Sequence, residues 1–251
     1  MKKSQLKSLT EESIKSITVS PSKNFKIIRR LLPKRTEHIK EKEGYIVYFD
    51  ISSSSTIMEA LQTSNKVSAW RILIIRIRKL LIDMTEAGRI EVYKFLGDGW
   101  IIFIKHGYTG EYIMDILAEI AFKFKLEYYN LIYHILEKEI PYQGMTFGIV
   151  FDKIYGIKMD GREEWIGRPL NVASRLQGQS SKAPKIIKNK GLSSNVAFIE
   201  MFKDGSCTVR ANKTKVKLRN ISNKFECWFF ILDDLVDRIE KSSNFTTSPF
   251  K

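Results

Sequence analysis

Val92-Tyr-Lys-Phe-Leu-Gly-Asp-Gly-Trp-Ile-Ile-Phe103 is the stretch that decides the fold. An apolar run stops at Leu96-Gly97-Asp98-Gly99 and resumes at Trp100. Because Asp and Gly favour tight turns, the stretch predicts a β-hairpin that carries Asp98 in its turn. An Asp-Gly pair taken alone indicates only a turn, so the function of Asp98 depends on what lies elsewhere in the chain.

A second acidic residue ends another apolar stretch, Ile46-Val-Tyr-Phe-Asp-Ile-Ser-Ser-Ser-Ser-Thr56. The nearly continuous apolar run predicts a central strand that ends at Asp50. A run of hydroxyls then precedes a predicted helix, at Ser52, Ser53, Ser54 and Ser55. These residues either cap that helix or form a turn whose backbone N–H groups point at an anion, and both can hold together.

A third stretch, Trp165-Ile-Gly-Arg-Pro-Leu-Asn-Val-Ala-Ser-Arg-Leu176, predicts a helix with polar residues on one side. Pro169 suits the first turn of a helix. Asn171 and Arg175 are four residues apart and therefore share one face of it.

The remaining pattern predicts an α+β fold, with long helices packed on a mixed sheet. Amphipathic helices are predicted over residues 65–87 and 111–138. Further strands are predicted over 145–151, 153–159, 163–166, 206–210, 213–218 and 225–232.

Composition narrows the class of protein. The chain has 251 residues, a net charge of +14 and two cysteines without metal-ligand spacing. Its basic residues are not interleaved with aromatic ones in an RNA-binding pattern, so we expect no nucleic-acid partner. The apolar runs are too short for a membrane span and no export signal follows Met1, so we expect a cytoplasmic protein without membrane contact.

The two aspartates suggest phosphoryl chemistry. Carboxylates at the rim of one sheet can hold two divalent ions, and oxygen ligands without nearby His or Cys favour Mg²⁺ or Mn²⁺. Arg175 adds a permanently charged planar donor for a phosphoryl group. The residues therefore predict a nucleotide site.

Four motifs together resemble the class III nucleotidyl cyclases in residues, order and spacing. They are Phe49-Asp-Ile-Ser-Ser-Ser-Ser-Thr, Lys94-Phe-Leu-Gly-Asp-Gly, Gly148-Ile-Val and Gly167-Arg-Pro-Leu-Asn-Val-Ala-Ser-Arg-Leu. The resemblance runs from about Gly44 to Leu232 and implies a class III cyclase-like (ferredoxin-like) sheet packed with long helices. It divides the chain into a basic N-terminal arm (1–43), a catalytic domain (44–240) and a flexible tail (241–251).

The resemblance also implies a head-to-tail homodimer with two sites at its interface. One subunit binds two Mn²⁺ or Mg²⁺ ions per site, and the other contributes the base-reading lysine and the ribose and transition-state residues. The implied positions are Asp50, Ile51 and Asp98 for metal, Lys94 and Glu164 for the base, Ser52 to Ser55 for the nucleotide, and Asn171 and Arg175 for catalysis. Arg219 and Lys224 are both candidates to grip the triphosphate.

The implied reaction converts a nucleoside triphosphate to a 3′,5′-cyclic nucleotide and pyrophosphate. Glu164 departs from the Asp or Thr usual in adenylate cyclases, and a lysine beside a carboxylate can read either adenine or uracil. Phe95, Trp100 and Trp165 are large enough to shorten a purine pocket, or are simply core residues.

A stand-alone chain with a basic arm resembles the pyrimidine cyclases of the bacterial Pycsar antiphage systems. We therefore expect UTP as substrate, cUMP as product and a cyclic-nucleotide-responsive effector downstream. Two alternatives stay open: an adenylate cyclase that makes cAMP, and a nucleotide- or nucleic-acid-binding module without turnover.

Overall fold

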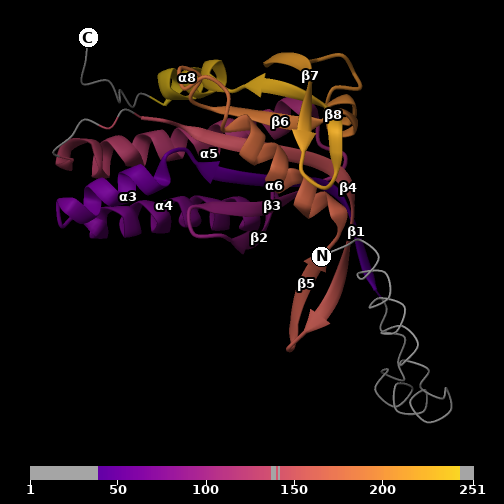
Figure 1. Ribbon diagram of the computed structural model, residues 1–251, viewed down its shortest axis with the longest axis horizontal. Coiled ribbons are helices and arrows are strands. Elements are labelled where there is room, and N and C mark those ends of the chain that lie inside the picture. Colours follow the sequence, from indigo (N-terminus) through magenta and orange to yellow (C-terminus); the bar gives the residue numbers. More distant parts are fainter. Residues whose placement is uncertain (1–38, 137–139, 141, 244–251) are drawn as a thin grey trace, which may run out of the picture. The chain divides into compact units, whose positions relative to one another are not determined.

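A computed structural model describes residues 39–136, 140 and 142–243 (Figure 1). Most of the expected arm (1–43) and the end of the expected tail (244–251) lie outside these ranges. The first strand, β1, begins at Lys40, so its first four residues come from the segment assigned to the arm.

Eight strands form one mixed sheet in the described part of the chain. They are β1 (Lys40–Ile51), β2 (Glu91–Phe95), β3 (Gly99–Lys105), β4 (Met145–Met159), β5 (Arg162–Ile166), β6 (Lys190–Ser194), β7 (Arg210–Leu218) and β8 (Ser222–Ile231). Their order is β2-β3-β1-β4-β6-β8-β7, and β5 pairs with β4 outside this path. Only β4 and β6 run parallel; the other pairs are antiparallel.

Helices connect these strands. They are α3 (Ser54–Thr63), α4 (Val67–Glu86), α5 (Gly110–Leu131), α6 (Arg168–Ser180), α7 (Asn195–Met201) and α8 (Asp233–Ser242), with a 3₁₀ turn at Tyr133–Ile135. In the described part of the chain, no helix is both long and apolar enough to cross a lipid bilayer. The expected α+β fold is thus confirmed, including the hairpin β2–β3 with Asp98 in its turn.

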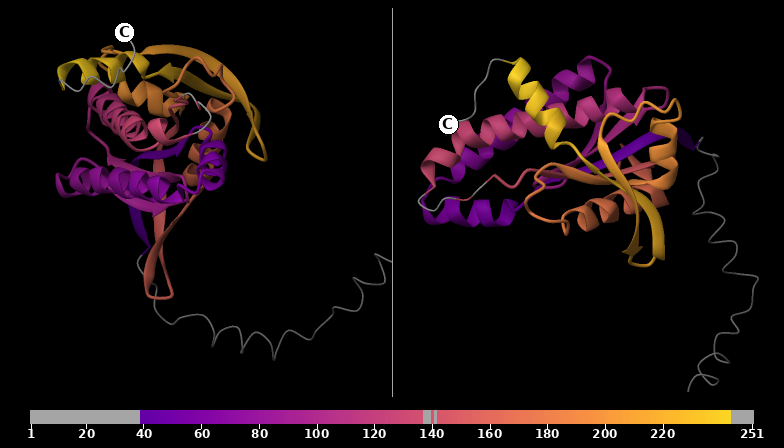
Figure 2. Two further views of the ribbon diagram at one scale, coloured as in Figure 1. Left: turned by 90° about the vertical axis from the view of Figure 1, so that its left-hand side faces the viewer. Right: turned by 90° about the horizontal axis from the view of Figure 1, so that it is seen from above.

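The sheet separates two apolar cores. The larger one packs α3, α4, α5, α7 and α8 against one face, and Leu73, Ile77 and Leu81 of α4 illustrate the helical period of its buried stripe. The smaller core packs α6 against the other face through Val172, Ala173 and Leu176. Helix α8 crosses α5, while the β4–β5 hairpin projects away from the sheet (Figure 2).

Helix α6 approaches the sheet so closely that one strand position must lack a side chain. A Cβ at Gly148 of β4 would collide with the carbonyl oxygen of Ala173 and approach the amide nitrogen of Gln177 at 2.5 Å. The glycine therefore sets the depth at which α6 rests on the sheet.

Three predictions about local structure are wrong. Residues 145–151 and 153–159 form the single strand β4, because the extended β1 continues to pair with it from Gly44–Asp152 to Lys40–Gly156. No strand forms at 206–209, and β7 begins at Arg210. The predicted helix over 111–138 ends at Leu131. Helix α8 was not predicted.

Candidate active site

Asp50 and Asp98 converge at one end of the sheet, where β1 ends and the β2–β3 turn lies. Asp50 is the penultimate residue of β1 and pairs with Gly99, the residue after Asp98. The Ile51 amide also donates a hydrogen bond to the Asp98 carbonyl oxygen at 3.3 Å. A Cβ at Gly99 would collide with the backbone oxygen of Phe49, so only glycine lets the turn close against β1.

The Asp50 carboxylate lies in an environment that disfavours its charge. Burial, followed by the nearby charge of Asp98, raises the pKa of Asp50 to about 7. The Gln177 side-chain amide donates to Asp50 Oδ2 at 3.4 Å, but Oδ1 is buried without a hydrogen-bond partner. A buried carboxylate oxygen of this kind costs free energy unless a donor or a cation meets it.

The serine turn, residues 52–55, holds Asp98 in place. The buried Ser54 hydroxyl donates a hydrogen bond to Asp98 Oδ2. Ser53 has a left-handed backbone, with φ of 60°, and the Ser52 amide donates to the Gly144 carbonyl at 3.0 Å. Since no side chain caps α3 at Ser53, the N-cap interpretation of the serines is wrong for that residue.

These groups line a cavity of about 440 Å³. Its lining residues are Asp50, Ile51, Ser52, Ser53, Ser54, Ser55, Asp98, Gln143, Thr146, Gln177, Gly178, Ser181, Lys185 and Lys190. The cavity thus combines acidic groups, hydroxyls and two lysines.

The donor set fits a divalent cation of the hard, oxygen-binding kind. Two neighbouring carboxylates, one of which has an unpartnered oxygen, lose their mutual repulsion when a cation binds. The side chain of Ile51 is 1% exposed and apolar, so this residue can offer only its backbone carbonyl. No cluster of three or more His, Cys, Asp or Glu side chains occurs in the described ranges.

Lys94 and Glu164 form a separate pair. Lys94 Nζ lies 3.3 Å from Glu164 Oε2, and the Tyr93 hydroxyl donates to the same oxygen at 2.7 Å. The hydrogen bonds from Tyr93 and Lys94 lower the pKa of Glu164, which keeps this carboxylate charged. Tyr93 also accepts from the Trp165 amide at 3.1 Å, so it fixes β5 against β2.

Asn171 and Arg175 lie on α6 away from the acidic cavity. Asn171 is exposed and Arg175 is partly exposed. Neither side chain forms a hydrogen bond or ion pair with any residue that the structure describes, and neither lines the cavity. Lys94 and Glu164 do not line it either. One chain therefore assembles the acidic pair and the Lys94–Glu164 pair but does not bring all predicted residues into one site.

Among the cavity residues that were not predicted, Gln177 and Thr146 lie beside Asp50. The Gln177 amide bridges Asp50 and Thr146, with a 2.7 Å hydrogen bond to Thr146 Oγ1. Thr146 faces Asp50 across the β1–β4 ladder. Gln177 comes two residues after Arg175, so helical spacing places it on a different side of α6. This spacing was the signal in the sequence that could have separated Gln177 from Asn171 and Arg175.

The three aromatic residues considered for the base pocket differ. Trp100 is 1% exposed and stacks on Phe49, so it belongs to the core. Trp165 packs edge-on against Phe103 and is covered by Lys42. Phe95 is 48% exposed and packs on Trp100, so it faces the opposite side of the sheet from Lys94, which pairs with Ile101.

No protein-family model and no curated protein matches the sequence. The structure, however, is similar to solved cyclase structures. The adenylyl cyclase CyaB from P. aeruginosa aligns with a TM-score of 0.59 at 16% identity, over 77% of this chain and 95% of that one. The guanylyl cyclase Cya2 aligns with a TM-score of 0.56 at 14% identity, over 76% and 92%. A bacterial light-regulated adenylyl cyclase aligns with a TM-score of 0.57 at 16% identity, over 95% and 69%. The chain therefore has the fold of class III cyclase catalytic domains.

Proposed function

We propose that the protein is a nucleotidyl cyclase that converts a nucleoside triphosphate to a 3′,5′-cyclic nucleotide and pyrophosphate. The observation that carries the proposal is the pairing of Asp50 and Asp98, with a buried unpartnered carboxylate oxygen, at the edge of a sheet of cyclase fold. In the reaction the ribose 3′-oxygen attacks the α-phosphorus and the bond to the bridging oxygen breaks. Pyrophosphate leaves, and the hydroxyl proton passes to solvent.

Asp50, Asp98 and the Ile51 carbonyl would hold Mg²⁺ or Mn²⁺. Two such ions would supply activation of the attacking oxygen and neutralisation of charge on the phosphates. The positions of Asp50 and Asp98 are set before any ion binds, because strand pairing and the Ser54 hydrogen bond fix both carboxylates.

The second half of the site would come from another copy of the chain. Asn171 and Arg175 have no partner in the described structure and lie outside the acidic cavity, which is expected if they serve a neighbouring subunit. In a head-to-tail dimer, Asn171 would orient the ribose and Arg175 would stabilise charge that develops on the α-phosphate.

Base choice rests on Lys94 and Glu164, which lie within 3.3 Å of each other. Lys94 can donate to O4 of uracil while Glu164 accepts from N3–H. The same pair can donate to N1 of adenine and accept from its 6-amino group, so ATP is the second candidate substrate. We favour UTP and a cUMP messenger read by an effector in phage defence, because Glu164 departs from the adenylate pattern.

The test is incubation with each of the four nucleoside triphosphates and Mn²⁺, followed by chromatography of the products. We expect cUMP to be the main product. Exclusive formation of cAMP would support the adenylate alternative. Absence of every cyclic product, with tight and salt-sensitive binding of DNA or RNA, would support a binding module instead.

A further inference from the structure

The sequence offers two candidates to grip the triphosphate, Arg219 and Lys224. Arg219 and Lys224 are both exposed, and neither lines the cavity of the acidic pair. The cations that do line it are Lys185 and Lys190. The structure therefore offers two lysines for a polyphosphate at this edge of the sheet.

Lys190 is already used for structure. It is 4% exposed, and its ammonium donates to the carbonyls of Ala183, Pro184 and Ile187 at 3.2, 2.9 and 2.7 Å. An ammonium has three N–H donors, so these three carbonyls satisfy all of them. Lys190 has no donor left for a ligand.

Lys185 is the lysine with a free charge. Its side chain is exposed, and it forms no hydrogen bond or ion pair within the described ranges. It lies in the loop of residues 181–189, between two of the carbonyls that Lys190 holds, those of Pro184 and Ile187. The loop thus carries a free ammonium on a backbone that is fixed on either side of it.

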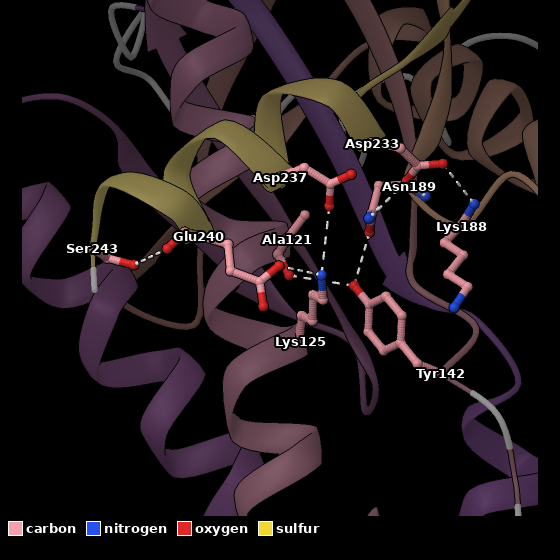
Figure 3. Close-up of polar contacts among 9 residues, drawn as sticks. All are labelled: Ala121, Lys125, Tyr142, Lys188, Asn189, Asp233, Asp237, Glu240 and Ser243. Carbon is pink, nitrogen blue, oxygen red and sulfur yellow. Dashed lines mark hydrogen bonds and ion pairs between the residues drawn. The ribbon is translucent and has the colours of Figure 1, made fainter. Parts of the chain in front are cut away.

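The far end of the loop is fixed as well. Asp233, the first residue of α8, accepts from the Lys188 amide at 3.1 Å and from the Asn189 amide at 2.8 Å (Figure 3). The Asn189 side chain in turn accepts from the Tyr142 hydroxyl at 3.0 Å and from the Met145 amide at 3.2 Å. These bonds join the loop to the start of β4, beside the site.

The sheet register places this loop next to the acidic pair. Asp50 of β1 faces Thr146 of β4, and Thr146 faces Lys190 of β6, so the three residues form one row across adjacent strands. The loop that Lys190 holds therefore lies at the same edge as the metal-binding carboxylates. The serine turn, 52–55, lines the same cavity and offers hydroxyl donors.

We propose that Lys185 binds the terminal phosphates of the nucleotide, and hence the pyrophosphate product, in the cavity that Asp50 and Asp98 line. The inference rests on the proposed function and assigns its missing polyphosphate contact. A lysine suits this position because a flexible point charge can follow the phosphates from substrate to departing product. The subunit that holds the metals would then also hold the leaving group.

Calorimetric binding of inorganic pyrophosphate to the full chain with Mg²⁺, at one ionic strength, tests the proposal. We expect Lys185→Met to weaken pyrophosphate binding at least tenfold and Lys185→Arg to stay within about threefold of the parent chain. Lys182→Met is the matched control, since Lys182 is an exposed lysine of the same loop that does not line the cavity. We expect this control to bind normally.

Three results would overturn the inference: normal binding by Lys185→Met, an equal loss with Lys182→Met, or no binding by the parent chain. The experiments distinguish a failure of this inference from a failure of the proposed function. If no triphosphate is cyclised yet pyrophosphate still binds through Lys185, the polyphosphate site stands and the cyclase proposal falls. If cUMP forms at an unchanged KM with Lys185→Met, the enzyme stands and the role of Lys185 falls.

Discussion

The side-chain amide of Gln177 on α6 donates to the Asp50 carboxylate on β1 at 3.4 Å. The same amide donates to Thr146 at 2.7 Å, so it fixes the orientation of an acidic side chain from the helix that also carries Asn171 and Arg175. Residues that orient a metal ligand affect metal affinity without touching the metal.

Replacing Gln177 by Met should therefore weaken metal binding. Met keeps the length and helix propensity but cannot donate to Asp50, so we expect the Mn²⁺ concentration for half-maximal activity to rise about 10- to 100-fold. Gln179→Met is the control, because its amide donates instead to the Lys217 carbonyl. An unchanged Mn²⁺ requirement in Gln177→Met would contradict this role.

Asp50 should make the metal-free protein less stable as pH rises. Its pKa of about 7 lies above its ordinary value, so the folded state favours the protonated form. The stability this provides is present in acid and is lost as pH rises through 7. Asn mimics the protonated form at every pH. With EDTA, Asp50→Asn should thus raise Tm at pH 8 by about 2–4 °C, after allowance for solvent screening, and change it little at pH 4.

Scanning fluorimetry at both pH values measures this difference. Added Mn²⁺ should reverse the order at pH 8, because it stabilises the parent chain and not Asp50→Asn. A variant less stable than the parent at pH 8 in EDTA would refute the account of Asp50.

Complementation tests the divided site. We expect Asp50→Ala and Asp98→Ala to abolish turnover, and Arg175→Ala to lower it by about three orders of magnitude. Mixing Asp50→Ala with Arg175→Ala should restore about a quarter of the parent activity, because half of randomly formed dimers then hold one intact site. Normal turnover by Arg175→Ala, or a mixture no more active than its parts, would rule out the proposed interface.

Glu164→Gln should change the choice of base. The Gln amide still accepts one hydrogen bond but loses the charge that pairs with Lys94, so we expect kcat/KM for the preferred triphosphate to fall about tenfold or more. The informative measurement is the ratio of kcat/KM values among the four triphosphates. Tyr93→Phe removes the other hydrogen bond to Glu164 and leaves Lys94 in place, so its ratio should stay close to that of the parent. An equal loss with all four substrates would mean that Glu164 is structural.

Two glycines, one on β4 beneath α6 and one within α6, should respond oppositely to alanine. Gly148→Ala forces a methyl group into the backbone of α6, and we expect a loss of about 1–3 kcal/mol in the free energy of unfolding. Gly178, within α6, has open space around its Cβ position, so Gly178→Ala should add about 0.4–1 kcal/mol. Urea denaturation of both variants distinguishes these outcomes, and a neutral Gly148→Ala would mean that α6 can move outward.

The sequence predicted the parts of the fold that depend on local pattern. The hairpin around Asp98, the strand ending at Asp50 and the helix opening at Pro169 all follow from apolar runs and turn residues. The fusion of two predicted strands into β4 could not be read locally, because it depends on pairing with residues 40–44 of β1. Helix α8 was missed because its apolar residues are few and acquire meaning only when Leu235 and Val236 pack into the larger core.

The candidate site was predictable where residue type alone carries chemistry. Asp50 and Asp98 were found in this way, whereas Lys94 and Glu164 followed from the resemblance to the cyclase family. The structure brings each pair together. Gln177 and Lys185 were missed because an amide and a loop lysine are common on any surface. Only the depth at which α6 lies on Gly148, and the fixed loop around Lys190, reveal what these two residues face.

The turn between β2 and β3 has one more consequence. Only Phe95, Leu96 and Gly97 separate Lys94 from Asp98. In the proposed dimer, however, the two residues contact different nucleotides. Binding of a base to Lys94 in one nucleotide site would shift the Asp98 carboxylate, which would hold metal in the other site. The two sites would then be coupled through three intervening residues, so that a nucleotide bound at the first site would change the affinity of the second for its own nucleotide.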